Sequence, residues 1–280
     1  MKKLFSTVSS LFFLSFVSHL ALAQVTPAED TEITETQRNK QGSFHFGVTT
    51  AINNTWIFSE NEEQNNKHYE NITTYKQAPI GLAIGYKFSY RNDLQVEAYI
   101  SHQGQNFKLK AQGNGTGDKI GEKHINLTYL QVPLLWKFTT GDATRFNLHF
   151  GPQIGFLIKG EEINVITQAG GIKKDGSPIP TGTAVLAHKN KGEDLTKNIG
   201  GLNNLDPNLA LGFGLEKDIT DHLYLTGNLR FHYGFKDFRD AETVIDDTTG
   251  DKYILRYNIY GGVQFGIHYT FNRPWLKLKI

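Results

Sequence analysis

The chain has 280 residues, no cysteine, and 29 basic against 28 acidic residues, which gives a formal net charge of +1. A charge this close to zero offers no positive surplus for nucleic acid, so we exclude nucleic acid as a partner. The absence of cysteine excludes disulfides and a lipid anchor attached to cysteine.

The N-terminus has the form of a secretion signal. Lys2 and Lys3 precede an apolar run over 11–17, and Ala21-Leu22-Ala23 fits the small-residue cleavage pattern. We therefore predict a signal peptide over 1–23, with cleavage between Ala23 and Gln24. The apolar run is too short for a membrane anchor, because a spanning helix needs ~20 residues. Residues 24–42 are polar and lack apolar periodicity, which predicts a flexible tail.

From Ser43 onward, apolar and polar residues alternate with a period of two, the pattern of a strand with one apolar face. The clearest case is His222 to Phe235, where the leucines and phenylalanines fall on one face and Arg230 falls on the other. This segment is longer than the ~3–10 residues usual for a soluble strand. The eight predicted strands cover residues 43–52, 80–90, 94–101, 124–138, 146–158, 208–216, 222–235 and 253–271.

One strand changes phase. Within 124–138 the apolar residues are odd-numbered up to Tyr129 and even-numbered from Val132. Proline is tolerated inside a sheet only at edges and bulges. We therefore predict a β-bulge at Pro133.

The connections alternate in length. Long polar segments follow the first, third, fifth and seventh predicted strands, and short turns follow the second, fourth and sixth. Outer-membrane barrels have an even number of strands, short periplasmic turns and long extracellular loops. We therefore predict an all-β fold, an eight-stranded antiparallel transmembrane β-barrel over 43–271 that runs as an up-and-down meander with long extracellular loops. The tail over 24–42 would be periplasmic, and 272–280 would form a C-terminal tail.

A soluble lipocalin-like carrier would alternate in the same way, with its apolar face turned inward around a small ligand. The polar face of this chain is mostly Gly, Ala, Thr, Asn and Gln, whereas a soluble exterior is rich in Lys and Glu. That composition favours a narrow lumen. Seven aromatic residues near the short turns also predict a girdle at the periplasmic interface, namely Tyr86, Phe88, Tyr90, Trp136, Phe138, Tyr269 and Phe271.

Five charged residues on the polar face predict a lumen network, namely Lys87, Glu97, Glu216, Arg230 and Arg256. Such a network could gate the lumen or relay a species through it. Buried charges need partners in any case, so we expect these residues to neutralise one another in a structural role.

The remaining side chains give little sign of chemistry. Five of the ten histidines would face the lumen, but no HxxxH or carboxylate spacing joins them into a ligand set, so we predict no metal and no cofactor. No Ser/His/Asp group stands out, so we predict no catalytic residues and no enzymatic activity.

Several segments resemble PorT-like outer-membrane β-barrel proteins. Tyr129 to Phe138 (YLQVPLLWKF) is similar to one strand of that family, Gly151-Pro152 with Gly155 to the next, and Asp206 to Gly214 to a third. Arg256-Tyr257-Asn258 and Ile267 to Phe271 resemble its last strand, after which members commonly end, whereas this chain continues to Ile280. The resemblance covers about 43–271 and implies an eight-stranded outer-membrane barrel. It implies no catalytic residues, and a founding member assists protein secretion.

We therefore predict a non-enzymatic protein of the Gram-negative outer membrane, in contact with membrane lipid after export and signal cleavage. Its role would be structural or a surface interaction through the extracellular loops, above all 159–203, which we expect to contact an extracellular or secretion-system protein. Two alternatives remain, an accessory component of a protein secretion system and a soluble lipocalin-like small-ligand carrier.

Overall fold

The computed structural model describes residues 41–59, 69–110, 117–142, 144–168, 178, 180–189, 200–240, 245–246, 251–252 and 256–271. The predicted signal peptide with its cleavage site at Ala23 and Gln24, the tail up to residue 40 and the tail over 272–280 lie outside the described residues. No helix in the described part of the chain is long and apolar enough to span a membrane.

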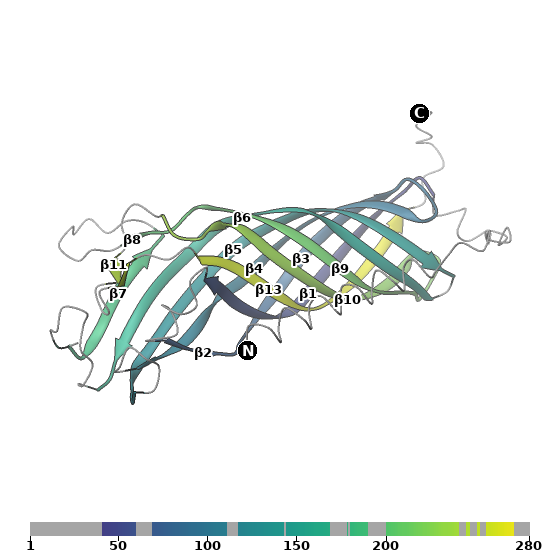
Figure 1. Ribbon diagram of the computed structural model, residues 1–280. Helices are drawn as coiled ribbons and strands as arrows, with labels where there is room; N and C mark the ends of the chain where they lie inside the picture. Colours follow the sequence, from purple (N-terminus) through teal and green to yellow (C-terminus); the bar gives the residue numbers. More distant parts are fainter. Residues whose placement is uncertain are drawn as a thin grey trace, which may run out of the picture. The chain divides into compact units, whose positions relative to one another are not determined.

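Eight long strands close into a ring within the described residues (Figure 1). Each strand pairs antiparallel with the next, and the first pairs with the last, which closes the barrel. The eight-stranded prediction is confirmed. The strands are β1 (Ser43–Ser59), β3 (Thr74–Lys87), β4 (Asn92–Lys110), β5 (Lys119–Gly141), β6 (Thr144–Ile166), β9 (Leu205–Asp218), β10 (Leu223–Asp237) and β13 (Arg256–Phe271).

The two ends of the barrel differ. Short connections join β3 to β4, β5 to β6 and β9 to β10 at one end, which we name the short-turn end. The opposite, long-loop end carries short additional strands: β2 (Tyr69–Ile72), β7 (Gly182–His188), β8 (Gly200–Gly201), β11 (Ile245–Asp246) and β12 (Asp251–Lys252) (Figure 1). Strand structure extends into the segment 159–203, because β6 continues to Ile166 and β7 pairs with it.

All eight barrel strands exceed the ~9–11 residues that a tilted strand needs to cross a membrane, and three exceed that length most. β4 has 19 residues, and β5 and β6 have 23 each. Toward the long-loop end, the outward faces of these strands become polar and their inward faces become apolar. In β5, Leu134, Trp136 and Phe138 point outward and are exposed, whereas the outward positions nearer the long-loop end are polar. These polar positions are Glu122, His124, Asn126 and Thr128.

The predicted bulge at Pro133 is wrong. The odd-numbered residues of β5 from Lys123 to Thr139 all face inward, and the pairing register does not shift at Pro133. The register shift between β5 and β6 lies near Ile158, opposite Thr128 and Tyr129. The change from odd to even apolar residues therefore marks the place where the strand leaves the apolar belt, because outside the belt the inward face is the apolar one.

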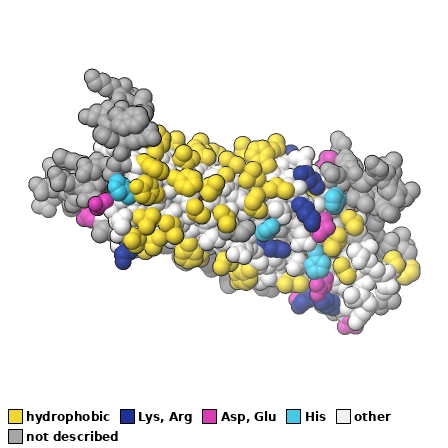
Figure 2. Space-filling model, turned by 180° about the vertical axis from the view of Figure 1, so that it is seen from behind, with side chains coloured by type: hydrophobic (Ala, Val, Ile, Leu, Met, Phe, Trp, Pro, Cys, Tyr) yellow, Lys and Arg dark blue, Asp and Glu magenta, His cyan; other side chains and the backbone are white. Residues whose placement is uncertain are grey.

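Large apolar side chains cover the outer surface of the barrel in a belt, which we name the apolar belt. It includes Phe46, Leu82, Leu134, Phe150, Leu211, Phe231 and Phe265, each at least 43 % exposed. On the face drawn in Figure 2, hydrophobic side chains (yellow) cover the middle of the barrel, and charged residues and histidines lie toward its two ends. An outward apolar face disfavours the soluble carrier, whose apolar face would turn inward.

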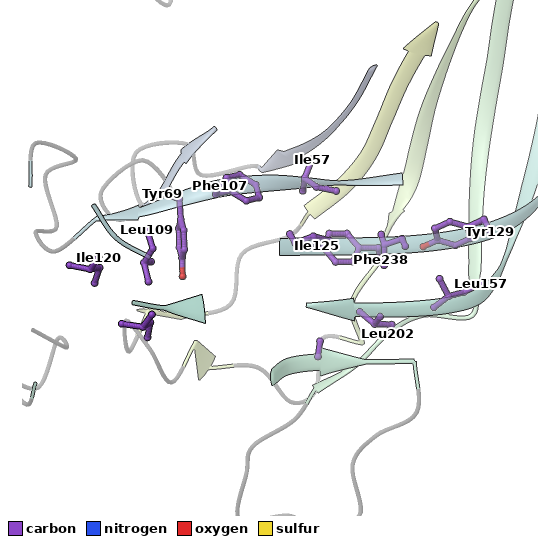
Figure 3. Packing of buried hydrophobic residues seen from close by; sticks show 13 residues of the cluster. Ile57, Tyr69, Phe107, Leu109, Ile120, Ile125, Tyr129, Leu157, Leu202 and Phe238 are labelled. Carbon is purple, nitrogen blue, oxygen red and sulfur yellow. The ribbon is translucent and has the colours of Figure 1, made fainter. Parts of the chain in front are cut away.

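Buried apolar residues gather instead at the long-loop end, inside the barrel wall (Figure 3). The inward faces of β4 and β5 supply Phe107, Leu109 and Ile125, and Phe238 follows the end of β10. We name this group the apolar cap. It comprises Ile57, Tyr69, Phe107, Leu109, Ile120, Ile125, Leu127, Tyr129, Leu157, Ile166, Ala187, Leu202 and Phe238.

Candidate functional site

The middle of the lumen holds a buried ion pair between opposite walls. Arg230 of β10 donates to both carboxylate oxygens of Glu97 of β4, at 2.6 and 2.9 Å. Gln264 of β13 donates to the same carboxylate at 3.2 Å, and Gln95 donates to it at 2.6 Å. The charge of Glu97 is therefore matched by one cation and two amide donors, which is the condition under which a buried carboxylate is tolerated.

His149 of β6 extends this group. Its Nε2 accepts a hydrogen bond from Arg230 Nε at 3.1 Å, and an arginine nitrogen can only donate. The proton of the neutral ring therefore lies on Nδ1, which donates to Asn147 Oδ1 at 2.9 Å. Asn147 in turn donates to Asn228 at 3.0 Å. The histidine is thus fixed between polar neighbours.

A second charged group lies at the short-turn end. Lys137 of β5 contacts Asp93 at 3.2 Å and Glu216 at 2.9 Å, and His45 contacts Asp93 at 2.7 Å. Arg145 of β6 pairs with Glu216 at 3.3 Å and also with Asp218. Cations and carboxylates alternate in this group, so it neutralises itself.

A third group lies within the apolar cap, beyond the apolar belt. Glu162 of β6 is fully buried and pairs with three cations, Lys123 at 2.5 Å, Arg256 at 3.1 Å and Arg239. Burial alone would raise the pKa of Glu162, but the charges of Arg239, Lys123 and Arg256 outweigh it and hold the pKa well below its ordinary value of 4.5. Glu162 therefore stays ionised at neutral pH and joins β5, β6, β13 and the segment after β10.

The five predicted lumen charges do not form one network. The structure brings Glu97 and Arg230 together, but it places Glu216 with Lys137 and Arg145, and Arg256 with Glu162. Lys87 is half-buried and lines a small cavity with Glu216, Asp93 and Lys137. Sequence reasoning missed several charged partners, namely Asp93, Lys123, Lys137, Arg145, Glu162 and Arg239.

The seven aromatic residues of the predicted girdle all lie toward the short-turn end. Phe88 and Trp136 are in edge contact, with ring centroids 6.0 Å apart, and Trp136 Nε1 donates to Asn92 Oδ1 at 3.0 Å. Tyr269 and Phe271 are in contact at 4.9 Å, and Tyr86 contacts Phe44 at 4.8 Å. These are amphipathic contacts of the kind found at membrane interfaces.

The described residues offer no catalytic constellation. Ser101 Oγ accepts a bond from Gln103, and Thr226 lies 3.4 Å from His268 Nε2. The ring of His268 stacks on Tyr224, with no carboxylate hydrogen-bonded to it among those residues. A nucleophile needs a base that a third group orients, and neither pair has that third group.

The lumen is filled by side chains. The cavities that its described residues line include three of about 20, 10 and 20 Å³. A buried water needs roughly 10–15 Å³, so each cavity holds about one water molecule. Arg230 lines two of these cavities, and Tyr99, which lines one of them, contacts Gln153 at 2.9 Å and Tyr260 at 3.2 Å. Among the described residues, side chains therefore occupy the middle of the lumen.

One family model and several solved structures are similar to this chain. A family model described as "Outer membrane protein beta-barrel domain" matches residues 28–240. No curated protein matches the chain significantly. Similar solved structures include the outer membrane protein OprG from Pseudomonas aeruginosa, with 12% identity, 84% of this chain and 98% of that chain covered, and a TM-score of 0.43.

Two further structures are similar to the chain. Ail, the attachment invasion locus protein of Yersinia pestis, has 9% identity, with 82% of this chain and 99% of that chain covered and a TM-score of 0.38. The outer membrane protease OmpT from Escherichia coli has 10% identity, with 82% and 97% covered and a TM-score of 0.42.

Proposed function

Because this chain belongs to the outer membrane protein β-barrel domain family, we propose that it is a non-enzymatic outer-membrane protein that acts by contact at its long-loop end. The protein resides in the outer membrane, with its apolar belt against lipid. Barrels of this kind keep short turns in the periplasm and long loops outside the cell. On that rule the long-loop end, including 159–203, is extracellular.

The observation that carries the proposal is the continuation of β4, β5 and β6 beyond the apolar belt. Their outward faces there are polar and carry charged side chains, among them Lys108, Lys110 and Glu122. Their inward faces form the apolar cap, and the lumen beneath is filled. The barrel therefore extends a β-sheet above the membrane, while side chains fill its lumen. This arrangement suits contact with a partner better than the passage of solutes.

Site-specific crosslinking tests this function, because the chain has no cysteine of its own. We expect a photoreactive label on Lys108→Cys or Glu122→Cys to capture a protein on intact cells, whereas the same label on Leu134→Cys in the apolar belt should capture none. Identification of one partner from both extracellular positions would support contact at this surface. Labelling of Thr220→Cys, in the turn between β9 and β10, on intact cells would contradict the orientation.

A second measurement addresses transport. The purified protein in planar bilayers should give no stepwise conductance, because the described lumen holds cavities of about one water each. A stable open-channel current would contradict the closed lumen and with it the contact function.

The PorT-like resemblance supports a narrower role, in which the partner belongs to a protein secretion system. The similar segments lie on β5, β6, β9 and β13, which form much of the barrel wall. A strain that lacks the protein should then lose secreted proteins from the medium, with their precursors retained in the periplasm. An unchanged set of secreted proteins would reject this role and leave the contact function standing.

A further inference from the structure

Oxygen atoms of three residues converge on Gly234 of β10, on the inner side of the barrel. A Cβ atom at this position would lie 2.9 Å from the main-chain oxygen of Asn258, 3.0 Å from Asp206 Oδ1 and 3.4 Å from Asn208 Oδ1. These oxygens come from β9 and β13, the two neighbours of β10. Because glycine has no Cβ, these oxygens can approach the main chain of β10 more closely than another residue would allow.

The Oδ1 atoms of these three residues receive no hydrogen bond. Asp206, Asn208 and Asn258 are 1 %, 3 % and 1 % exposed, and the Oδ1 atom of each has no partner. The amide groups cannot be turned to correct this. Asn208 Nδ2 donates to the main-chain oxygen of Asp206 at 2.6 Å, and Asn258 Nδ2 donates to Asp206 Oδ2 at 2.9 Å. Turning either amide would set oxygen against oxygen, so the acceptors are fixed and lack donors.

The carboxylate of Asp206 also lacks a counter-charge. The three buried glutamates, Glu97, Glu162 and Glu216, each pair with lysine or arginine. No described lysine or arginine forms an ion pair with Asp206. Lys236 acts on it electrostatically from a distance, but the side chain of Lys236 is exposed. A buried charge is normally paired or bound to a metal ion.

The strand pairing is broken at the same place. The register between β10 and β13 is interrupted between Tyr233 and Asp237, opposite Asn258. The main-chain oxygen of Asn258 lies in this interruption, next to Gly234. A ligand held by these oxygens would join β9 to β13 beside β10, where the pairing of β10 with β13 is incomplete.

We propose that Asp206 Oδ1, Asn208 Oδ1 and the main-chain oxygen of Asn258 bind a hard monovalent cation of the sodium class. Oxygen-only ligands select hard cations over transition metals. The described residues contain no group of three or more His, Cys, Asp or Glu side chains that could hold a metal, which also argues against zinc-type sites. One carboxylate neutralises one positive charge, whereas a divalent ion would leave a net charge buried in the barrel wall.

The test is thermal unfolding of the full protein in nonionic detergent micelles, followed by circular dichroism, in sodium chloride or in choline chloride of equal concentration. Ligand binding to the folded state alone raises its stability. We expect the wild-type midpoint to rise by several degrees, saturably, as sodium replaces choline. Asp206→Asn and Gly234→Ala should each abolish this difference, since the first removes the charge and the second crowds the oxygens with a methyl group.

Two further comparisons separate the site from ordinary structural roles. In choline, Asp206→Asn should be at least as stable as the wild type, because it removes an unpaired buried charge. Asp93→Asn, which breaks a paired carboxylate at the short-turn end, should lower the midpoint in both salts and keep the sodium difference. Lys236→Met should also keep it.

Three results would overturn the proposal. Equal wild-type midpoints in sodium and choline would mean that the space holds water or that Asp206 is protonated. A sodium response that persists in both Asp206→Asn and Gly234→Ala would place the ion elsewhere. Stabilisation by calcium chloride with none by sodium chloride would overturn the monovalent assignment.

Discussion

Arg230 and Glu97 form a two-point ion pair across the lumen, with nitrogen–oxygen distances of 2.6 and 2.9 Å. Both side chains are almost completely buried. Their strands, β10 and β4, are not neighbours in the sheet, so the pair joins separate parts of the barrel wall. Removal of one partner strongly destabilises the folded protein, because the other charge is left buried without compensation.

Arg230→Met should therefore lower the free energy of unfolding by about 3–5 kcal/mol, as expected when a buried pair is broken. Urea titration of the protein in lipid vesicles, followed by tryptophan fluorescence, measures the change. The double variant Arg230→Met with Glu97→Gln should recover much of the loss, because the unpaired carboxylate is gone. A double variant as unstable as the single one would show that packing rather than charge dominates.

Acid should loosen the apolar cap through Glu162. Burial raises the pKa of this carboxyl, but Arg239, Lys123 and Arg256 outweigh burial and hold the pKa below 4.5. A lowered folded-state pKa contributes stability that is present above the unfolded value and is lost as the pH falls below about 4.5. Protease cleavage at the long-loop end, on protein in vesicles, should accelerate below that pH. Glu162→Gln should be cleaved faster at neutral pH and show a much flatter acid response.

Asp237 makes the opposite contribution to the pH dependence of stability, and its effect can be separated from that of Glu162. Burial raises its pKa from 3.8 to about 6, so its ionisation costs stability as the pH rises through that range. Asp237→Asn should remove this cost at neutral pH and leave the acceleration of cleavage below pH 4.5 in place. If the acid response disappears in Asp237→Asn, then Asp237 rather than Glu162 causes it, which would contradict this prediction.

The alternation of apolar and polar residues predicted the apolar belt and the direction of its strands. Within the belt the outward face of each strand contacts lipid, so the residues on that face are apolar. The same alternation contains Lys137, which stands between the outward Trp136 and Phe138 and faces the lumen. Its partners could not be predicted, because pairing depends on how eight strands close into a ring. Glu97 and Arg230 are 133 positions apart in the sequence.

The apolar cap could not be predicted from the sequence for a different physical reason. Lys123 and Glu162 lie on strand segments whose outer face meets water, so the apolar residues there turn inward. The period of two continues, but the assumption that the apolar face meets lipid fails beyond the belt. The apparent change of phase near Pro133 in the sequence marks this edge of the apolar belt.

Phe238 should be essential to the cap, whereas Phe235, three positions earlier, should not. Phe238 is 1 % exposed inside the apolar cap, and Phe235 is 58 % exposed on the belt side of the strand. Phe238→Ala should cost about 3–5 kcal/mol, the usual loss for a buried phenylalanine. Phe235→Ala should cost much less. Urea titration compares the two variants, and equal losses would contradict the inward placement of Phe238.

The boundary of the apolar belt can be located on a single face of β5. Leu134 and His124 both point outward, but Leu134 lies in the belt and His124 lies among polar neighbours near Asn106, which it contacts at 3.1 Å. Arginine on the lipid face of a barrel costs about 2–4 kcal/mol near the middle of the bilayer and about 0–1 near its edges. Leu134→Arg should therefore show the larger loss in urea titrations in vesicles, and His124→Arg should be nearly neutral. In detergent micelles, which adapt their shape, the difference should shrink. A costly His124→Arg together with a tolerated Leu134→Arg would move the membrane toward the long-loop end and remove the extracellular sheet on which the contact function rests.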